Sequence, residues 1–172
     1  GRQTKTEEAV AMTNISNRKD DHIQLALETR HQSQSGSYFD RLTFEHSGLP
    51  ELSLDDIDIS CHFLGKPLSA PFMIGAMTGG CNNGERINQH LAEAAEQCHI
   101  PMALGSQRAA LEESLAQNVR RWAPRATILG NLGATQLQQS GLDLAKRAVE
   151  SVDANALIIH LNPLQELIQP NG

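Results

Sequence analysis

Four short clusters of polar and glycine residues carry the side chains that could do chemistry in this chain. They are Met77-Thr78-Gly79-Gly80, Gly105-Ser106-Gln107-Arg108, Gly130-Asn131-Leu132-Gly133 and the run from His160 to Glu166. Thr78, Ser106 and Asn131 can hydrogen-bond the heteroatom edge of a planar ligand. Glycines 79, 80, 130 and 133 would let a flat or phosphorylated ligand approach the backbone closely. Each cluster taken alone is equally well explained as an ordinary turn after a strand.

Basic side chains at two places are suited to binding phosphate. Arg108 directly follows an apolar run, and a guanidinium there can bind phosphate bidentately. Arg18 and Lys19 form a second basic group, and His22 shares a helical face with Arg18. The competing interpretation is that these are solvated charges at the starts of helices.

The last cluster adds acid–base and metal-binding groups. Glu166 is a hard oxygen ligand that suits Mg²⁺ shared with phosphate oxygens. His160 and Gln165 are the acid–base candidates beside it. The alternatives are a glutamate at a helix start after Pro163 and a buried histidine within an apolar strand.

Each cluster follows a short apolar run that is typical of a buried strand: residues 72–76, 101–105, 126–130 and 155–161. Helical patterns separate the runs, with apolar faces made by Ile87, Leu91, Ala94, Ala95 and Cys98, by Leu111, Leu115, Val119 and Trp122, and by Leu142, Ala145, Ala148, Val149 and Val152. This alternation predicts parallel strands joined by helical crossovers and covered on both faces. The carboxyl ends of such strands meet at one edge, so the four clusters should form one site.

The predicted fold is α/β, a (β/α)8 TIM barrel of which this chain holds about the first four βα units. A doubly wound open sheet is the alternative that periodicity does not exclude. Half a barrel exposes strand edges, so we expect further residues beyond Gly172. The domain prediction is a disordered segment over 1–16, then the N-terminal half of a barrel over 17–172. Within it we expect a helix over 20–30, a linker over 31–40, a strand over 57–64 and a turn at Gly65-Lys66-Pro67.

Charge and composition exclude several functional classes. The chain has 172 residues, a net charge of −6 and a pI of about 5.6, which argues against non-specific nucleic-acid binding. Its three cysteines are widely spaced, which predicts a reduced, cytoplasmic protein without a disulfide framework. No apolar run approaches the ~20 residues needed to span a bilayer.

Six segments together resemble type II isopentenyl diphosphate isomerases. They are NRKDDHIQLALE (17–28), FDRLTFEHSGLPE (39–51), PFMIGAMTGG (71–80), GSQRAALE (105–112), GNLGA (130–134) and HLNPLQELIQP (160–170). They follow the family's order and cover nearly the whole chain after Asn17. The chain resembles the N-terminal half of such an enzyme, and Asn171 stands where family members commonly have an acidic residue.

The resemblance implies a TIM barrel that binds FMN and Mg²⁺ and interconverts isopentenyl and dimethylallyl diphosphate. It also implies NADPH as the reductant of the flavin and a homo-oligomer, a tetramer or an octamer. The resemblance also implies roles for individual site residues. Those expected to bind substrate are Arg18, Lys19, Ser106, Gln107, Arg108 and Gln165. Those expected to contact the flavin are Ala76, Met77, Thr78, Ser106 and Asn131. Gln165 and His160 are the expected catalytic residues, and Glu166 is the expected Mg²⁺ ligand.

The family continues for about another half barrel, with a lysine near the flavin and the glycine-rich loops that hold the FMN phosphate. We therefore expect the 172-residue chain alone to be an incomplete, inactive fragment. Two alternatives stay open. One is another FMN-dependent TIM-barrel oxidoreductase, and the other is a non-catalytic half barrel.

Overall fold

The computed structural model describes residues 24–31, 35–77 and 84–164 of the chain. The predicted disordered segment over residues 1–16 lies outside these ranges.

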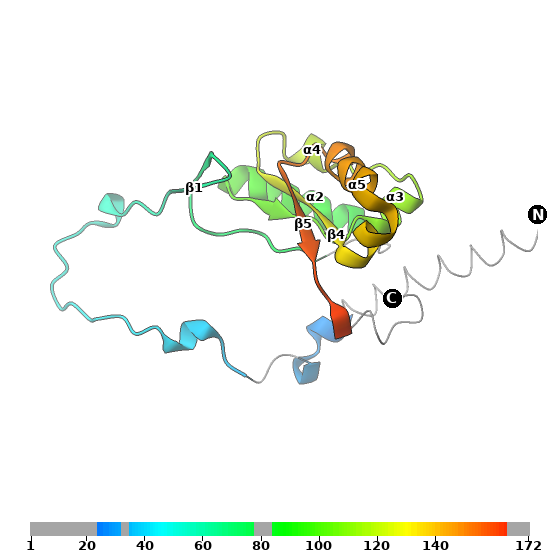
Figure 1. The fold of residues 1–172 in the computed structure, drawn as a ribbon. Coiled ribbons are helices and arrows are strands. Elements are labelled where there is room, and N and C mark those ends of the chain that lie inside the picture. Colours follow the sequence, from blue (N-terminus) through cyan, green and yellow to red (C-terminus); the bar gives the residue numbers. More distant parts are fainter. Residues whose placement is uncertain (1–23, 32–34, 78–83, 165–172) are drawn as a thin grey trace, which may run out of the picture.

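Three parallel strands form the central sheet (Figure 1): β3 Met102–Ala103, β4 Ile128–Gly133 and β5 Ala156–His160. Their order in the sheet is their order in the chain, and Ile74 makes a parallel bridge to Met102. The strands of a barrel stay adjacent in chain order, whereas a doubly wound sheet changes direction at a switch point. The α/β class is confirmed, and the described strands follow the barrel order. The run 72–76 contributes a bridge instead of a full strand, so four complete βα units remain a prediction.

Four helices occupy the connections: α2 Gly84–Cys98, α3 Arg108–Glu112, α4 Val119–Trp122 and α5 Ala134–Ser151. One buried cluster joins α2 and α4 to the strands and includes Ala92, Ala95, Met102, Val119 and Ile128. A second cluster joins Leu111, Leu132 and Ala148. Residues 128 and 132 of β4 thus face the helices. Because side chains alternate along a strand, Leu129, Asn131 and Gly133 belong to the opposite face.

The predicted helical faces are wrong in detail. In α2 the fully buried positions are Ala92 and Ala95, while Ala94 and Cys98 are exposed. The single helix expected to carry Leu111, Leu115, Val119 and Trp122 is two short helices, α3 and α4. Ser114 has a φ of 54°, which no α-helix contains, and Leu115 is 55% exposed.

The last helix is also interrupted. Gly141 has φ 70° and ψ −165°, so α5 is kinked there. Residues after the kink do not continue the face of those before it, and Leu142, predicted to be inside, is 78% exposed. A residue that leaves helical φ/ψ resets the 3.6-residue period from which that face was inferred.

A β-hairpin precedes the sheet. Strands β1 Cys61–Phe63 and β2 Lys66–Leu68 pair antiparallel, with Phe63 opposite Lys66. The two-residue turn is Leu64-Gly65, with φ of 51° and 74°, so the predicted turn at residues 65–67 lies one residue too late. Positive φ at both positions matches the right-handed twist of the paired strands. The predicted strand over 57–64 is correct only for its last part, because residues 57–60 pair with no strand among the described residues.

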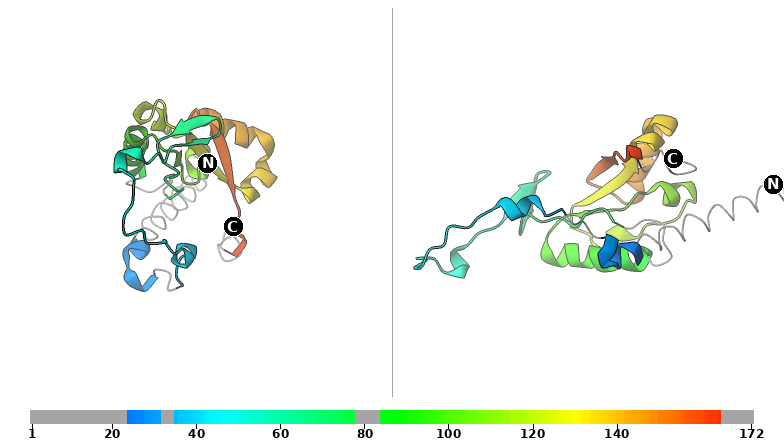
Figure 2. Two further views of the ribbon diagram at one scale, coloured as in Figure 1. Left: turned by 90° about the vertical axis from the view of Figure 1, so that its left-hand side faces the viewer. Right: turned by 90° about the horizontal axis from the view of Figure 1, so that it is seen from below.

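The segment over residues 35–60 runs outside this body, as Figure 1 and the right-hand view of Figure 2 show. It contains the short 3-10 helices η2 Tyr38–Arg41 and η3 Leu54–Asp56, while η1 Thr29–His31 follows a single helical turn at 24–27. Of the helix predicted over 20–30, residues 24–27 form this turn and Thr29 and Arg30 belong to η1. Large apolar side chains are exposed along the outer segment: Tyr38, Phe39, Leu42, Phe44, Leu49, Leu52, Leu54, Ile57 and Ile59. Isolated exposed apolar residues are common, but so many in one segment mark a surface suited to contact with other protein.

Two charged side chains hold the amino ends of the strands. Glu96 accepts hydrogen bonds from the backbone N–H groups of Arg125 and Ala126, at 2.9 and 2.8 Å, and from Arg125 Nε at 2.6 Å. Burial raises the pKa of Glu96, but the hydrogen bonds from the Arg125 side chain and from both backbone groups outweigh this, and the pKa lies below its ordinary value. Arg120 Nη1 donates to the carbonyls of Ala123 and Ala126, at 3.0 and 2.9 Å, and Nη2 donates to that of Asp153. Among the described residues, no helix is both long and apolar enough to cross a membrane.

Candidate functional site

Three of the four predicted clusters lie along one edge of the sheet. The backbone N–H of Gln107, just past β3, donates to the carbonyl of Asn131 at 2.9 Å. Gly133 and His160 are paired at the ends of β4 and β5. Ala76 and Met77 follow the parallel bridge at Ile74, so their stretch of chain runs toward the same edge. This is the carboxyl edge, where ligands bind in parallel α/β folds.

Asn131 and His160 form the closest polar contact at this edge. His160 Nδ1 lies 2.7 Å from Asn131 Oδ1, across neighbouring strands. Asn131 is only 4% exposed, and the His160 side chain is half-buried. By strand alternation both side chains belong to the face turned away from the helices. The two residues were predicted separately, one as a flavin contact and one as an acid–base group, and their direct link was missed. The available signal was their location at the ends of consecutive strands.

The glycines of the third cluster make room for protein side chains. A Cβ on Gly130 would lie 2.6 Å from Gln107 Oε1 and 3.2 Å from Leu157 Cδ1. A Cβ on Gly133 would lie 3.1 Å from His160 Nε2 and would clash with Gln136 Oε1. Packing within the protein therefore favours glycine at both positions, and ligand approach to them stays a prediction. At both positions the space next to the backbone is occupied by a neighbouring side chain.

Gln107 lies on the helix-covered side, inside the protein. Its side chain is 0% exposed, and its Oε1 accepts from the backbone N–H of Asn131 at 2.9 Å. Its Nε2 donates to Ala148 O at 3.0 Å, to Gln117 Oε1 at 3.0 Å and to Ser151 Oγ at 3.2 Å. An amide nitrogen has two protons, so one of these protons is shared between two of the three acceptors. The side chain expected to bind substrate thus connects β4, α5 and the loop before α4.

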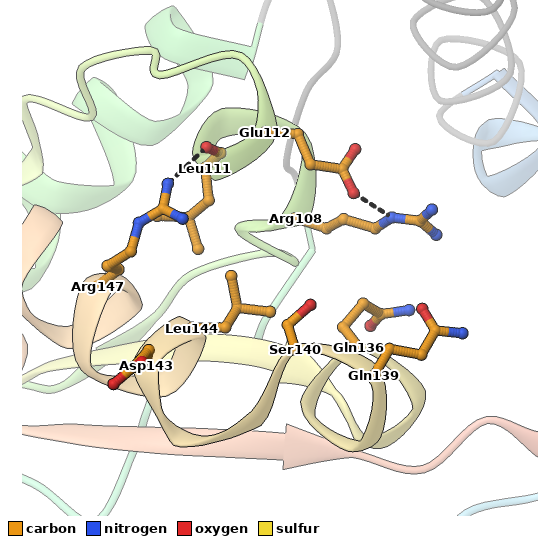
Figure 3. Close-up of a pocket in the computed structure, with 9 residues that line it drawn as sticks. All are labelled: Arg108, Leu111, Glu112, Gln136, Gln139, Ser140, Asp143, Leu144 and Arg147. Carbon is orange, nitrogen blue, oxygen red and sulfur yellow. Dashed lines mark hydrogen bonds and ion pairs between the residues drawn. The ribbon is translucent and has the colours of Figure 1, made fainter.

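Arg108 begins α3 and lines a pocket of about 220 Å³ between α3 and α5 (Figure 3). Its Nε donates to Glu112 Oε1 at 2.9 Å, and in Figure 3 its two terminal nitrogens point away from Glu112. Gln136, Gln139 and Ser140 of α5 lie across the pocket. Both partners of the ion pair are partly exposed, so the pair is weak. Glu112 engages Nε, and the structure gives no hydrogen-bond partner among the described residues to the two terminal nitrogens. Ser106, half-buried, precedes Gln107 at the strand end.

Arg18, Lys19, Thr78, Gln165 and Glu166 lie outside the described residues, as do Gly79 and Gly80. Within the described ranges, no three His, Cys, Asp or Glu side chains are grouped so as to hold a metal ion. Glu166, the expected Mg²⁺ ligand, lies outside the described residues, so the predicted Mg²⁺ site is not tested by this finding.

Comparison with known proteins gives one family match and many relatives. The model of the family described as FMN-dependent dehydrogenase matches residues 11–161. The isopentenyl-diphosphate delta-isomerase of Xanthobacter autotrophicus is 52% identical over 161 residues, which are 90% of this chain and 47% of that protein. The enzymes of the same name from Cronobacter sakazakii and Halobacterium salinarum are each 48% identical, over 92% and 93% of this chain and 47% and 46% of their own length. The chain spans about half the length of the curated relatives it matches. Its resemblance to these isomerases is confirmed, and the chain belongs to the FMN-dependent dehydrogenase family.

Proposed function

We propose that this chain is the N-terminal part of an isomerase that interconverts isopentenyl and dimethylallyl diphosphate with reduced FMN and Mg²⁺. The observation that supports this most is the joining of the GSQR, GNLG and His160 clusters at one strand edge. Relatives that are 48–52% identical to this chain bear the isomerase name. The proposed whole is a type II enzyme, a (β/α)8 barrel about twice as long as this chain, assembled as a homo-oligomer in the cytoplasm.

In this proposal, basic and polar groups at the strand ends bind the phosphate groups of the substrate. Arg108 suits this role because Glu112 engages only its Nε and leaves both terminal nitrogens for bidentate binding. Ser106 is its partner at the same turn, and Arg18 and Lys19 are proposed to join them. The Gln107 side chain is used inside the protein, so we propose that Gln107 contributes by holding the turn and not by touching substrate.

The strand edge also fits a planar, hydrogen-bonding cofactor. Asn131 uses its Oδ1 toward His160, which leaves its Nδ2 as a donor, and Ser106 offers a hydroxyl. Ala76, Met77 and Thr78 would complete the FMN contacts. When bound and reduced by NADPH, FMN would supply the proton-transfer chemistry of the interconversion.

The reaction adds a proton to the terminal carbon of the alkene and removes one from the allylic carbon, with no net oxidation. Because an unactivated alkene is a weak base, the site must exclude water and hold the proton donors firmly. His160 and Gln165 are the proposed polar residues beside the reacting carbons. Glu166 is proposed to hold Mg²⁺, which neutralises the diphosphate charge.

The test compares this chain with a version extended to the length of the relatives. Each is supplied with reduced FMN, Mg²⁺ and isopentenyl diphosphate, and dimethylallyl diphosphate is measured by NMR. We expect product from the extended protein and none from the 172-residue chain. Absence of product from both, with FMN bound to the extended protein, would overturn the proposal. Reduction of that FMN by a 2-hydroxy acid would favour an oxidoreductase instead.

In the extended protein, Arg108→Lys should raise the KM for isopentenyl diphosphate about tenfold, because an ammonium cannot replace a bidentate guanidinium. Arg86→Lys, an exposed arginine of α2, is the matched control and should leave KM unchanged.

A further inference from the structure

The hydrogen bond between His160 and Asn131 determines which nitrogen of the histidine carries its proton. Nδ1 lies 2.7 Å from Asn131 Oδ1, a carbonyl oxygen that can only accept. Nδ1 must therefore bear hydrogen in every protonation state that keeps this contact. In neutral imidazole only one nitrogen is protonated, so Nε2 then has the free lone pair.

The surroundings hold both partners in place. Asn131 is almost fully buried, and its own backbone N–H and carbonyl are both bonded to Gln107. The His160 ring packs against Gly133, where an added Cβ would lie 3.1 Å from Nε2. Rotation of either side chain would break the Nδ1–Oδ1 contact, and rotation of the His160 ring would also remove it from Gly133.

We propose that Asn131 is a positioning residue that fixes the Nδ1–H tautomer of His160 and makes Nε2 the nitrogen that exchanges protons with the ligand. For the chemistry, this rests on the proposed function. Neutral His160 would then accept a hydrogen bond at Nε2, and it could donate one to a phosphate oxygen only after taking up a proton. Asn131 would meet the cofactor through Nδ2 alone, so the cofactor atom it contacts must be an acceptor.

The tautomer can be measured in the 172-residue chain without any ligand or activity. Histidine is labelled with ¹⁵N and ¹³C, and His160→Gln identifies the His160 signals among those of the seven histidines. In alkaline buffer, the wild-type spectrum should show His160 with hydrogen on Nδ1. Asn131→Ala should lose this signature, because nothing then holds Nδ1 as the donor. Asn131→Asp should keep it, because a carboxylate oxygen also accepts from Nδ1.

Asn118→Ala is the control, since Asn118 is exposed and its side chain donates to Glu85 and not to Asn131 or His160. It should leave the His160 signals unchanged. Hydrogen on Nε2 in the wild-type chain would overturn the proposal, because the Asn131 amide would then be turned to donate through Nδ2. This outcome would be observed in the wild-type chain, so it does not depend on the folding of any variant. The result is also independent of isomerase activity, so failure of the proposed function would be recognised separately in the extended protein.

Discussion

Replacing Gln107 by methionine tests whether this residue is structural. Methionine has a similar length and fills the same space, but it removes both ends of a fully buried amide. The backbone N–H of Asn131 then loses its acceptor and stays buried, which costs about 1–3 kcal/mol. Ala148 O keeps Ser151 Oγ as a donor at 3.0 Å, so its loss is smaller.

Adding about 1 kcal/mol for the bonds from Nε2 gives a total of roughly 3 kcal/mol. For a chain of this size, that corresponds to a fall in Tm of about 6–12 °C. Urea unfolding followed by the fluorescence of Trp122, which packs against the core, measures the free energy directly. Gln139→Met, at an exposed position of α5, is the control and should stay within about 0.5 kcal/mol of wild type.

A Gln107→Met variant as stable as the control would refute this reasoning. If the extended protein carrying it also lost affinity for inorganic pyrophosphate, Gln107 would be a ligand-binding residue after all. Lower stability with unchanged pyrophosphate affinity is the result we expect.

Three further predictions concern charge and exposed surface. Arg120→Met should destabilise the chain by about 3 kcal/mol or more in urea unfolding, because it removes charged donors from three carbonyls. The control Arg121→Met, at an exposed position, should cost little. Equal effects of the two substitutions would contradict the role of Arg120. The pKa of Glu96 is lowered in the folded state. Its contribution to the free energy of unfolding should therefore be complete when the pH is above the ordinary pKa of 4.5, and it should be lost as the pH falls through the folded-state pKa. Urea unfolding of wild type and Glu96→Gln from pH 7 to 3 checks this, and a stability difference that grew on acidification would have the wrong sign. The exposed apolar side chains over 38–59 should cause concentration-dependent self-association in sedimentation velocity, and Phe39→Ser with Phe44→Ser should weaken it; a monomer at all concentrations would count against this.

Periodicity and composition located three of the four predicted parallel strands and the residues that follow them. The runs over 101–105, 126–130 and 155–161 overlap β3, β4 and β5. The strands β3 and β4 are buried throughout, as an uninterrupted apolar sequence predicts, whereas β5 is only partly buried and its Ile159 is 53% exposed. Their parallel pairing followed from the helical patterns between them. These two inferences together placed Ser106, Asn131 and His160 at one edge before any contact was known.

Local patterns did not reveal which neighbour each side chain would meet. Gln107 and Asn131 are both polar residues at strand ends, yet one faces the helices and the other the opposite side. Leu115 and Leu142 fit helical periods that a positive φ at Ser114 and Gly141 breaks. Such outcomes depend on packing between segments far apart in the chain, and a hydrogen bond such as that from His160 to Asn131 exists only once β4 and β5 lie side by side.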